Sequence, residues 1–406
     1  MTPTCRHCAT PLSLRFLDLG FAPPSNAYLA PKDLSRPEVT FPLRLLACSA
    51  CRLVQTEDFA AADALFTEDY AYFSSTSKGW LTHAAEYSDM VSNRFDLGAD
   101  SHVIEVASND GYLLKNFVAK GIPCLGIEPT KSTAEAARAI GIPVKQEFFG
   151  AEFAETLEKA DLIAGNNVYA HVPDINDFTE GLCIALKVEG VITLEFPHLM
   201  RLVEFRQFDT VYHEHFSYLS LFAVERIFAA AGLRVFDVEE LPTHGGSLRI
   251  FGCHAAASHT ETTAVVALRA QEQARGMDTD AYYLAFQAEA DAVKDGFLHF
   301  LLDAKAQGKT VAAYGAAAKG NTIMNYAGVK PDLLPFVCDA ADAKIGKFMP
   351  GSHIPIMAPD ALRQQRPDYV VILPWNIAAE VKNQLSDLSA AGTKFVTAVP
   401  ALEITE

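Results

Sequence analysis

Short apolar runs alternate with helical patterns through the middle of the chain. Such a run, four to seven residues long and bounded by turn residues, is typical of a buried strand, and the intervening stretches repeat with helical spacing. A sheet whose strands alternate with helices is doubly wound, with most strands parallel. The predicted strands are 103–107, 124–128, 161–167, 190–196 and 248–254, and the predicted helices follow Gly111 and cover 133–141, where a glycine ends the helix.

Three further regions lie outside this pattern. Residues 255–308 are alanine-rich, charged and without a strand signal, which predicts a helical hairpin or a long linker helix. A second alternating set follows at 310–316, 335–340 and 368–374. Residues 1–60 are rich in proline and loops, and we expect them to be too small and broken for a large core. The overall prediction is an α/β protein in three parts, which cover 1–70, 71–254 and 255–406.

Length and charge narrow the classes of protein. A chain of 406 residues, half of them hydrophobic, can bury two or three cores. A net charge of −17 argues against a surface that binds nucleic acid. The sequence contains no apolar run of membrane-spanning length, and its first residues do not resemble a secretory signal. We therefore expect a cytoplasmic protein with neither a membrane nor a nucleic acid as partner.

Four cysteines form two matched pairs, Cys5-x-x-Cys8 and Cys48-x-x-Cys51. Each pair supplies half of a tetrahedral thiolate site, which is the arrangement that structural zinc prefers. With all four positions taken by cysteine, the metal would stabilise the small N-terminal part rather than catalyse. The alternative is four ordinary buried cysteines. The remaining cysteines lie in apolar segments, where inert packing is the better interpretation.

The turn after the first predicted strand is rich in small and acidic residues. This turn, in the stretch VIEVASNDGYLL, brings the backbone close to a ligand at the carboxyl end of a parallel strand. The acidic side chain of Asp110 would repel a pyrophosphate but can accept hydrogen bonds from an ammonium group. Glu128, at the end of the next strand, can accept hydrogen bonds from ribose hydroxyls. These features favour S-adenosylmethionine over a dinucleotide, with a generic strand–turn–helix as the alternative. The candidate cofactor-binding residues are Glu105, Ser108, Asn109, Asp110, Gly111, Glu128, Pro129 and Asn166.

The segment YHEHFSY places Tyr212, His213, Glu214 and His215 side by side between apolar residues. A histidine can take a proton from a weak carbon acid, a carboxylate can orient it, and a tyrosine hydroxyl can donate a hydrogen bond to developing oxyanion charge. A metal site is the alternative, although the sequence offers no obvious third ligand. Asn166, Asn167 and His171, after another strand, are either site residues or ordinary turn and structural residues.

The C-terminal part carries its own candidate turn. The sequence YGAAAKGNT follows a predicted strand, and a Gly- and Ala-rich turn that opens a helix offers free N–H groups to an anion, to which Lys319 adds a positive charge. The stretch HGGSLR could add donors for a diphosphate, with a tight turn as the alternative. The candidate substrate-binding residues are His244, Gly245, Gly246, Ser247, Arg249, Tyr314, Lys319 and Asn321.

Taken in order, the cysteine pairs and the motifs YAYFSSTSKGW, EVASNDGYLL, GIEPT, NNVYAHV, YHEHFSY, HGGSLR and YGAAAKGNT give the whole chain a resemblance to one family. The chain resembles the sugar C-methyltransferases that act on C3 of dTDP-linked 4-keto-deoxysugars. The resemblance implies a zinc-binding domain, a central S-adenosylmethionine domain and a C-terminal Rossmann-like domain that helps to hold the nucleotide sugar. One position departs from the family pattern, because Ala107 stands where glycine is common.

The resemblance also implies roles for individual residues. His215 would remove the C3 proton of the keto sugar, with His171 as a second candidate. Glu214 and Tyr212 would orient this base and stabilise the enolate, and Asn167, Tyr70 and Tyr72 would also face the sugar. Alternatives are methylation of nitrogen or oxygen, or a nucleotide-sugar-binding protein without activity. We expect a monomer.

Overall fold

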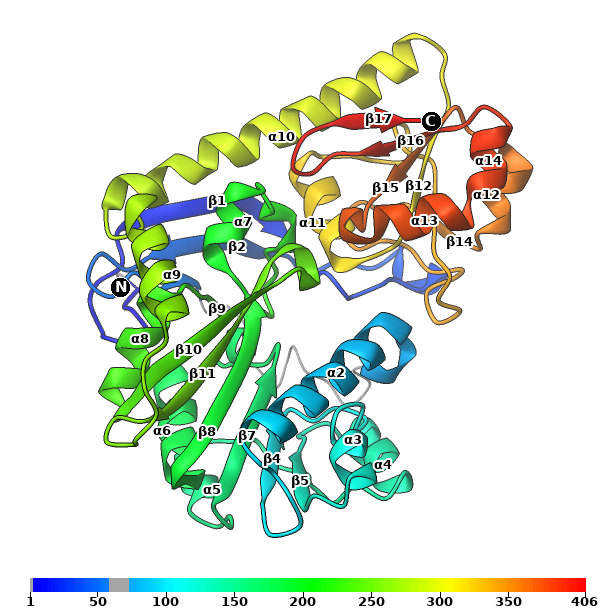
Figure 1. Ribbon diagram of the computed structural model, residues 1–406. Helices are drawn as coiled ribbons and strands as arrows, with labels where there is room; N and C mark the ends of the chain where they lie inside the picture. The colour runs from blue at the N-terminus through cyan, green and yellow to red at the C-terminus, as the bar shows by residue number, and fades with distance from the viewer. Residues whose placement is uncertain (1–2, 58–72) are drawn as a thin grey trace.

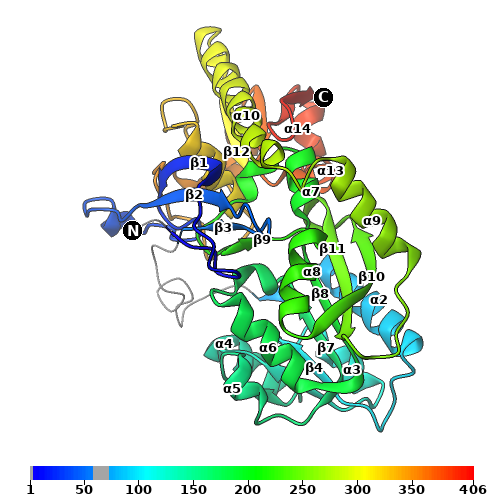
Figure 2. The ribbon, with the colours of Figure 1, turned by 90° about the vertical axis from the view of Figure 1, so that its left-hand side faces the viewer.

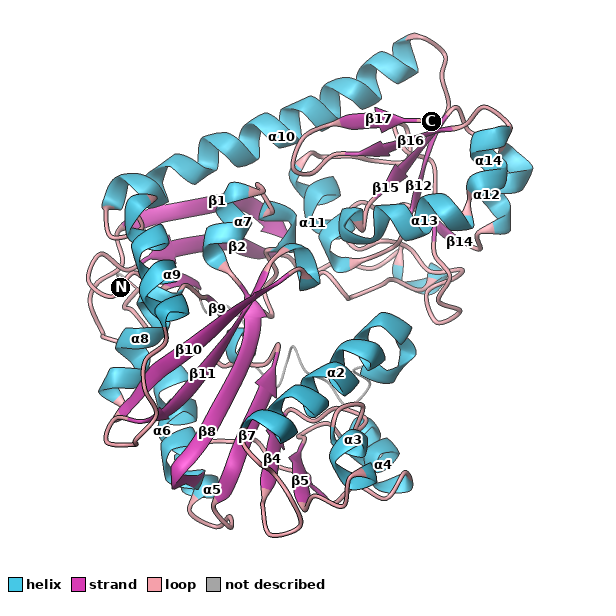
Figure 3. Ribbon diagram, in the orientation of Figure 1, coloured by secondary structure: helices cyan, strands magenta, loops and turns pink. Residues whose placement is uncertain are grey.

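The computed structural model describes residues 3–57 and 73–406, and its strands fall into three sheets (Figures 1 and 3). We call them the N-terminal, central and C-terminal sheets. Tyr70 and Tyr72, two of the predicted site residues, lie outside the described residues.

The central sheet has seven strands in the order β10-β11-β8-β7-β4-β5-β6. The strands from β8 to β6 are parallel to their neighbours, whereas β11 and β10 run antiparallel at one edge. The mostly parallel, doubly wound sheet predicted from the sequence is therefore confirmed, and β6 and β10 are additional strands that the sequence did not indicate. The strands are β4 (Val103–Val106), β5 (Cys124–Ile127), β6 (Val144–Lys145), β7 (Ala160–Asn166), β8 (Leu186–Pro197), β10 (Leu233–Leu241) and β11 (Ser247–His254).

Helices cover both faces of the central sheet. Successive strand residues point to opposite faces, so Val103 packs under α2 and α3, whereas Ile104 belongs to the core under α6 and α8. Figures 1 and 2 show these two helical layers on opposite sides of the sheet. The helices are α2 (Lys78–Arg94), α3 (Leu114–Ala119), α4 (Lys131–Ala139), α5 (Ala151–Ala154), α6 (Ile175–Ala185), α7 (Leu199–Glu204) and α8 (Leu221–Ala230).

The N-terminal sheet corrects the expectation that residues 1–60 are too broken for a core. Its strands are β1 (Leu14–Ala22), β2 (Phe41–Ala47), β3 (Val54–Thr56) and β9 (Ser217–Tyr218), in that order. Phe16 is fully buried and its ring stacks on Phe286 of the long helix α10, with 4.8 Å between ring centroids. The segment builds a core because α10 covers it and β9 completes its sheet. Both partners lie far away in the sequence, so the local pattern does not reveal these contacts.

The C-terminal region begins with the predicted helical hairpin, α9 (Thr263–Ala274) and α10 (Asp280–Ala306). Helix α10 runs along β1 and reaches the C-terminal sheet, whose strand order is β14-β13-β12-β15-β16-β17 (Figure 1). The strands are β12 (Val311–Tyr314), β13 (Val337–Cys338), β14 (Ile356–Met357), β15 (Tyr369–Ile372), β16 (Lys394–Thr397) and β17 (Glu403–Thr405), and the helices are α11 (Ala318–Tyr326), α12 (Asp360–Gln365), α13 (Ala378–Gln384) and α14 (Ser386–Ala390).

Short 3-10 helices complete the connections, and four of them (η3, η4, η5 and η6) carry residues discussed below. They are η1 (Pro31–Asp33), η2 (Ser74–Thr76), η3 (Tyr169–His171), η4 (Phe208–Thr210), η5 (Thr243–Gly245) and η6 (Trp375–Ile377). Within residues 3–57 and 73–406, no helix combines the length and the apolar character that crossing a bilayer requires.

Candidate active site

One cavity of about 900 Å³ lies at the carboxyl ends of the parallel strands of the central sheet. This edge is where doubly wound sheets bind their ligands. The cavity wall comes from all three regions of the chain: Asn26 from the N-terminal region, Asn109 and Glu128 from the turns after β4 and β5, and Lys319 from α11.

The turn after β4 is held in a sharply bent conformation. Ala107 and Asn109 have positive φ angles of 57° and 49°. The Asn109 backbone N–H donates to Glu128 Oε2 at 2.9 Å, and the Thr130 backbone N–H donates to Glu128 Oε1 at the same distance. Glu128 thereby fixes the two neighbouring turns against each other. Of the predicted cofactor residues, those that line the cavity are Asn109, Glu128, Pro129 and Asn166.

The other predicted cofactor residues, Glu105, Ser108, Asp110 and Gly111, lie behind this wall. Gly111 has a φ of 79°, and an added Cβ would lie 2.2 Å from Ile142 Cδ1, so the position requires glycine. Burial raises the pKa of the Glu105 carboxyl well above its usual value, with Glu128 and Asp110 adding to the rise.

Unpaired polar atoms test whether this region fits S-adenosylmethionine. Ser108 Oγ, Asp110 Oδ1 and Asn166 Oδ1 are buried without a hydrogen-bond partner in the part of the chain that the structure describes. Buried oxygens of this kind need partners. Asn166 lines the cavity, where the ammonium group or a ribose hydroxyl of this cofactor would supply a partner to Asn166 Oδ1, whereas Ser108 and Asp110 stand behind the cavity wall. The residues present therefore fit this cofactor.

A second group of polar side chains lines the cavity next to the cofactor turns. Tyr212, Glu214 and His215 lie in the loop between η4 and β9, and His171 lies in η3. The rings of His171 and His215 meet edge to face, with 4.5 Å between centroids, and the Tyr212 ring lies 4.9 Å from that of His215. Because β9 pairs with β3, the N-terminal sheet anchors this loop.

Burial sets the protonation state of these histidines, and a hydrogen bond fixes the tautomer of His171. His171 Nδ1 donates to the Glu214 main-chain carbonyl at 2.9 Å, which places the ring proton on Nδ1. Burial lowers the pKa of His171 to about 4. Burial also lowers the pKa of His215 well below its usual value, and the neighbouring His171 and His244 lower it further. Both imidazoles are therefore neutral at pH 7.

The two histidines of YHEH point in different directions. His215 lines the cavity, whereas His213 Nε2 lies 3.4 Å from the Phe41 carbonyl, against the N-terminal sheet. In the described ranges, the group of side chains arranged to hold a metal is the four cysteines, and YHEH does not take part in such a group. The metal interpretation of YHEH therefore has no structural support.

Asn167 has a φ of 55°, and its backbone N–H donates to the Glu195 carbonyl at 2.7 Å, so its side chain emerges at the cavity wall. The cavity is also lined by residues that the sequence analysis did not select, among them Asn26, Trp80 and Lys344. Trp80 lies within the motif YAYFSSTSKGW, which could have drawn attention to it. Asn26 lies in the proline-rich N-terminal region, where nothing in the sequence indicates chemistry.

On the C-terminal side, Lys319 lies in the first turn of α11 beside the cavity. Its Nζ donates to Asn376 Oδ1 at 2.7 Å and lies 4.4 Å from the centroid of the Trp375 ring. Burial lowers the pKa of this lysine, and Asp209 opposes that effect. Tyr314 and Asn321 point elsewhere, since the Tyr314 hydroxyl bonds Gln384 and the Asn321 amide donates to the Ser25 carbonyl. The predicted role of Tyr314 and Asn321 in substrate binding stays a prediction.

The stretch HGGSLR divides between three environments. His244, with a φ of 54°, lines the cavity. Gly245, Gly246 and Ser247 line a separate hollow of about 370 Å³. Arg249 donates to the buried Glu195 carboxylate at 2.8 Å and to Glu239 at 2.7 Å. The structure thus brings only His244 of this stretch to the large cavity.

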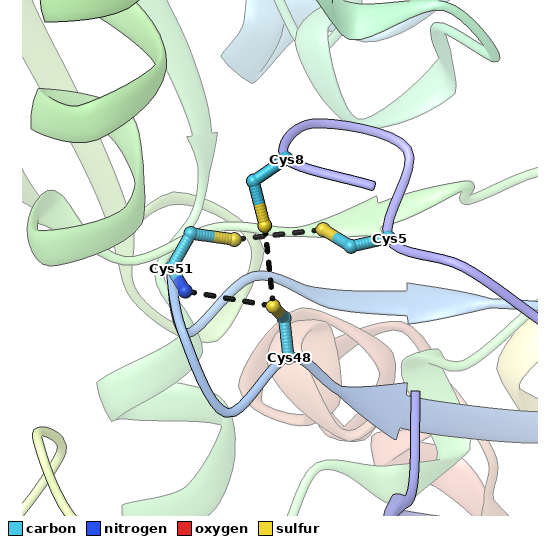
Figure 4. A group of neighbouring side chains, drawn as sticks. All are labelled: Cys5, Cys8, Cys48 and Cys51. Carbon is cyan, nitrogen blue, oxygen red and sulfur yellow. Dashed lines mark hydrogen bonds between the residues drawn. The ribbon is translucent and has the colours of Figure 1, made fainter. Parts of the chain in front are cut away.

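The four predicted metal ligands form one cluster (Figure 4). The sulfurs of Cys5, Cys8, Cys48 and Cys51 all lie within 4.8 Å of one another, and two pairs are 3.5 Å apart. Tetrahedral zinc with Zn–S bonds of about 2.3 Å spaces its sulfurs by about 3.8 Å. Gln55 Nε2 also donates to Cys5 Sγ at 3.2 Å, as expected around a thiolate ligand. The geometry and the donors both fit structural zinc.

Comparisons with known proteins agree with this description. Three family models match the chain: a zinc binding domain at residues 5–66, a methyltransferase domain at 80–238 and a C-methyltransferase C-terminal domain at 242–400. The C-methyltransferase NovU from Streptomyces niveus is 32% identical over 400 residues, which cover 98% of this chain and 95% of NovU.

Among solved structures, magnesium protoporphyrin IX methyltransferase from Synechocystis is 12% identical, covers 43% of this chain and 83% of its own, and gives a TM-score of 0.36. An S-adenosylmethionine-dependent methyltransferase from Mesorhizobium loti is 14% identical, covers 42% and 99%, and gives a TM-score of 0.35.

The sheet order, the bent turn after β4 and the matched methyltransferase domain define an S-adenosylmethionine-dependent methyltransferase with a zinc-binding cysteine cluster. At 32% identity over nearly the whole of both chains, the protein belongs to the same family as NovU, the C-methyltransferases.

Proposed function

We propose that this enzyme transfers a methyl group to C3 of a nucleotide-linked 4-keto-deoxysugar, with dTDP as the nucleotide that the family resemblance favours. The observation that carries the proposal is the cavity itself. It joins the cofactor turns to two neutral histidines, and it extends to the lysine at the start of α11. A ligand that reaches all three must combine a reactive carbon acid with an anionic end.

The proposed reaction begins with proton removal. A 4-keto group acidifies the C3–H bond, and His215, which burial keeps neutral, accepts the proton as the C–H electrons form an enolate. Tyr212 lies beside His215, and burial together with Asp209 raises the pKa of its hydroxyl, which stays protonated and can donate to the enolate oxygen.

Methyl transfer follows from the same arrangement. S-adenosylmethionine supplies an electrophilic methyl group on a positively charged sulfur. The enolate carbon would form the new C–C bond to that methyl group, the electrons of the broken methyl–sulfur bond would stay on the departing S-adenosylhomocysteine, and the proton on His215 would then pass to solvent. Asn167, at the cavity wall, and His171, held by the Glu214 carbonyl, would orient the sugar and the base. The carboxylate of Glu214, which also lines the cavity, would help to orient His215.

The experiment follows C3 deuterium uptake and methyl gain when the enzyme, S-adenosylmethionine and a dTDP-linked 4-keto-6-deoxy sugar react in heavy water. His215→Ala should lower both rates by roughly 10² to 10⁴, the usual contribution of a general base. His213→Ala is the matched control, because it removes the other imidazole of YHEH, which points away from the cavity. Equal losses in both variants, or no methyl gain with any nucleotide-linked keto sugar, would refute the proposal.

A further inference from the structure

The N-terminal region contributes a side chain to the active-site cavity. Asn26 lines the cavity, and its Nδ2 donates to both carboxylate oxygens of Glu214, at 3.2 and 3.4 Å. Glu214 is only 6% exposed. Asn26 thus partners the buried acid of YHEH from a segment some 190 residues away in sequence.

Residues 23–29, which include Asn26, are hydrogen-bonded to the C-terminal region rather than to the cysteine cluster. The Asn321 amide donates to the Ser25 carbonyl at 2.6 Å, and the Tyr28 hydroxyl donates to the Ala316 carbonyl at 2.6 Å. Leu29 exchanges two backbone hydrogen bonds with Phe348. The position of Asn26 is therefore set by the turn before α11 and by its own neighbours.

The contact matters electrostatically, because a buried carboxylate needs a donor. Burial raises the pKa of Glu214, and the Asn26 amide is the group that opposes this rise. The other titratable groups that face Glu214 are Tyr28, Tyr212 and Tyr218, with His171 bonded to its main chain and Lys344 beyond Tyr28. None of these tyrosines supplies a positive charge.

We propose that Asn26 is a positioning residue for methyl transfer: it holds the Glu214 carboxylate, ionised and in a fixed orientation, at the cavity wall. The inference rests on the proposed function for the step it assists. It also makes the C-terminal region part of the catalytic geometry, because Asn321 and Ala316 hold the 23–29 segment that presents Asn26.

The first experiment measures the pKa of the Glu214 carboxyl directly in the zinc-loaded protein. Glutamate is labelled with ¹³C at the carboxyl, and the Glu214 resonance is assigned by its loss in Glu214→Gln. In Asn26→Ala, and further in Asn26→Asp, the Glu214 pKa should rise. Asn26→Gln, which keeps an amide, should recover part of the change. The matched control, Asn116→Ala, removes an amide that bonds the Leu113 carbonyl outside the cavity, and should leave the pKa where it is.

The second arm measures turnover with the keto-sugar substrate. Asn26→Ala should lower kcat roughly 10- to 100-fold, the range for losing a hydrogen bond to a charged group, with its acidic limb displaced to higher pH. Affinity for S-adenosylmethionine and the melting temperature of Asn26→Gln should stay close to wild type. A purely structural role would instead change stability in parallel with activity.

If the pKa of Glu214 is unchanged in Asn26→Ala, the inference is overturned. It is also overturned if the pKa of Glu214 rises while kcat stays at the wild-type value. If Asn26→Ala does not fold, Asn26→Gln and Asn26→Asp decide the same question. Failure of the wild-type enzyme on every keto sugar would refute the proposed function instead, and the titration arm would still decide whether Asn26 controls Glu214.

Discussion

At the scale of single residues, the cavity is built on backbone conformations that most side chains avoid. Ala107, Asn109, Asn167 and His244 all have φ between 49° and 57° and all line the cavity. Asparagine and histidine are enriched in this left-handed region, whereas alanine adopts it at a cost of about 1–2 kcal/mol. Such outliers cluster at functional sites because the bent backbone presents side chains and N–H groups to a ligand.

Ala107→Gly tests this cost. Glycine adopts a φ of 57° without strain but gains freedom in the unfolded chain, so we expect a net stabilisation of about 0.5–1 kcal/mol. Urea unfolding at pH 7 measures the change. The control is Ala136→Gly, at a similarly half-buried position inside α4, which should destabilise by about 1 kcal/mol. A loss of stability at position 107 equal to that at 136 would contradict the prediction.

At the scale of elements, the sequence predicted what depends on local pattern and missed what depends on distant partners. The apolar runs before Ala107 and Glu128 end in polar turns, and this local signal was enough to predict β4, β5 and their meeting at one edge. Strand β9 is two residues long and exists because β3 pairs with it. Asn26 was not predicted for the same reason, because its hydrogen-bond partner Glu214 lies far away in the sequence.

The link between β3 and β9 predicts what zinc does for activity. Cys48 and Cys51 lie in the turn between β2 and β3, and β3 anchors β9, which begins two residues after His215. Cys48→Ser should reduce bound zinc and lower turnover about tenfold or more, equivalent to at least about 1.4 kcal/mol, because the His215 loop loses its anchor. Affinity for S-adenosylmethionine should persist, since the cofactor turns follow strands of the central sheet.

Metal content by mass spectrometry, calorimetric S-adenosylmethionine binding and turnover would separate these effects. Cys183→Ser is the matched control, because it removes a half-buried thiol outside the cluster and should keep zinc and activity. Loss of zinc without loss of turnover would contradict the prediction.

At the scale of the whole molecule, the three sheets converge on one cavity and present different chemistry to it. The central sheet presents acidic and amide groups, η3 and the loop before β9 each present a neutral histidine, and α11 presents Lys319 in its first turn. A substrate with a neutral sugar and an anionic diphosphate would lie with its reactive carbon near His215 and its phosphates near Lys319. The binding of the two ligands should therefore be separable by mutation.

Lys319→Met tests this separation, because methionine keeps an unbranched apolar side chain and removes the positive charge that lies over the Trp375 ring. We expect KM for the nucleotide sugar to rise roughly 10- to 100-fold, about 1.4–2.7 kcal/mol, as for loss of a charged hydrogen bond. The dissociation constant for S-adenosylmethionine should change little, because its predicted residues follow β4 and β5. The control, Lys305→Ala, breaks an exposed ion pair with Asp332 and should leave both constants unchanged. If Lys319→Met weakened the cofactor instead, the anionic end of the substrate would have to lie elsewhere, and the assignment of α11 to the phosphates would be wrong.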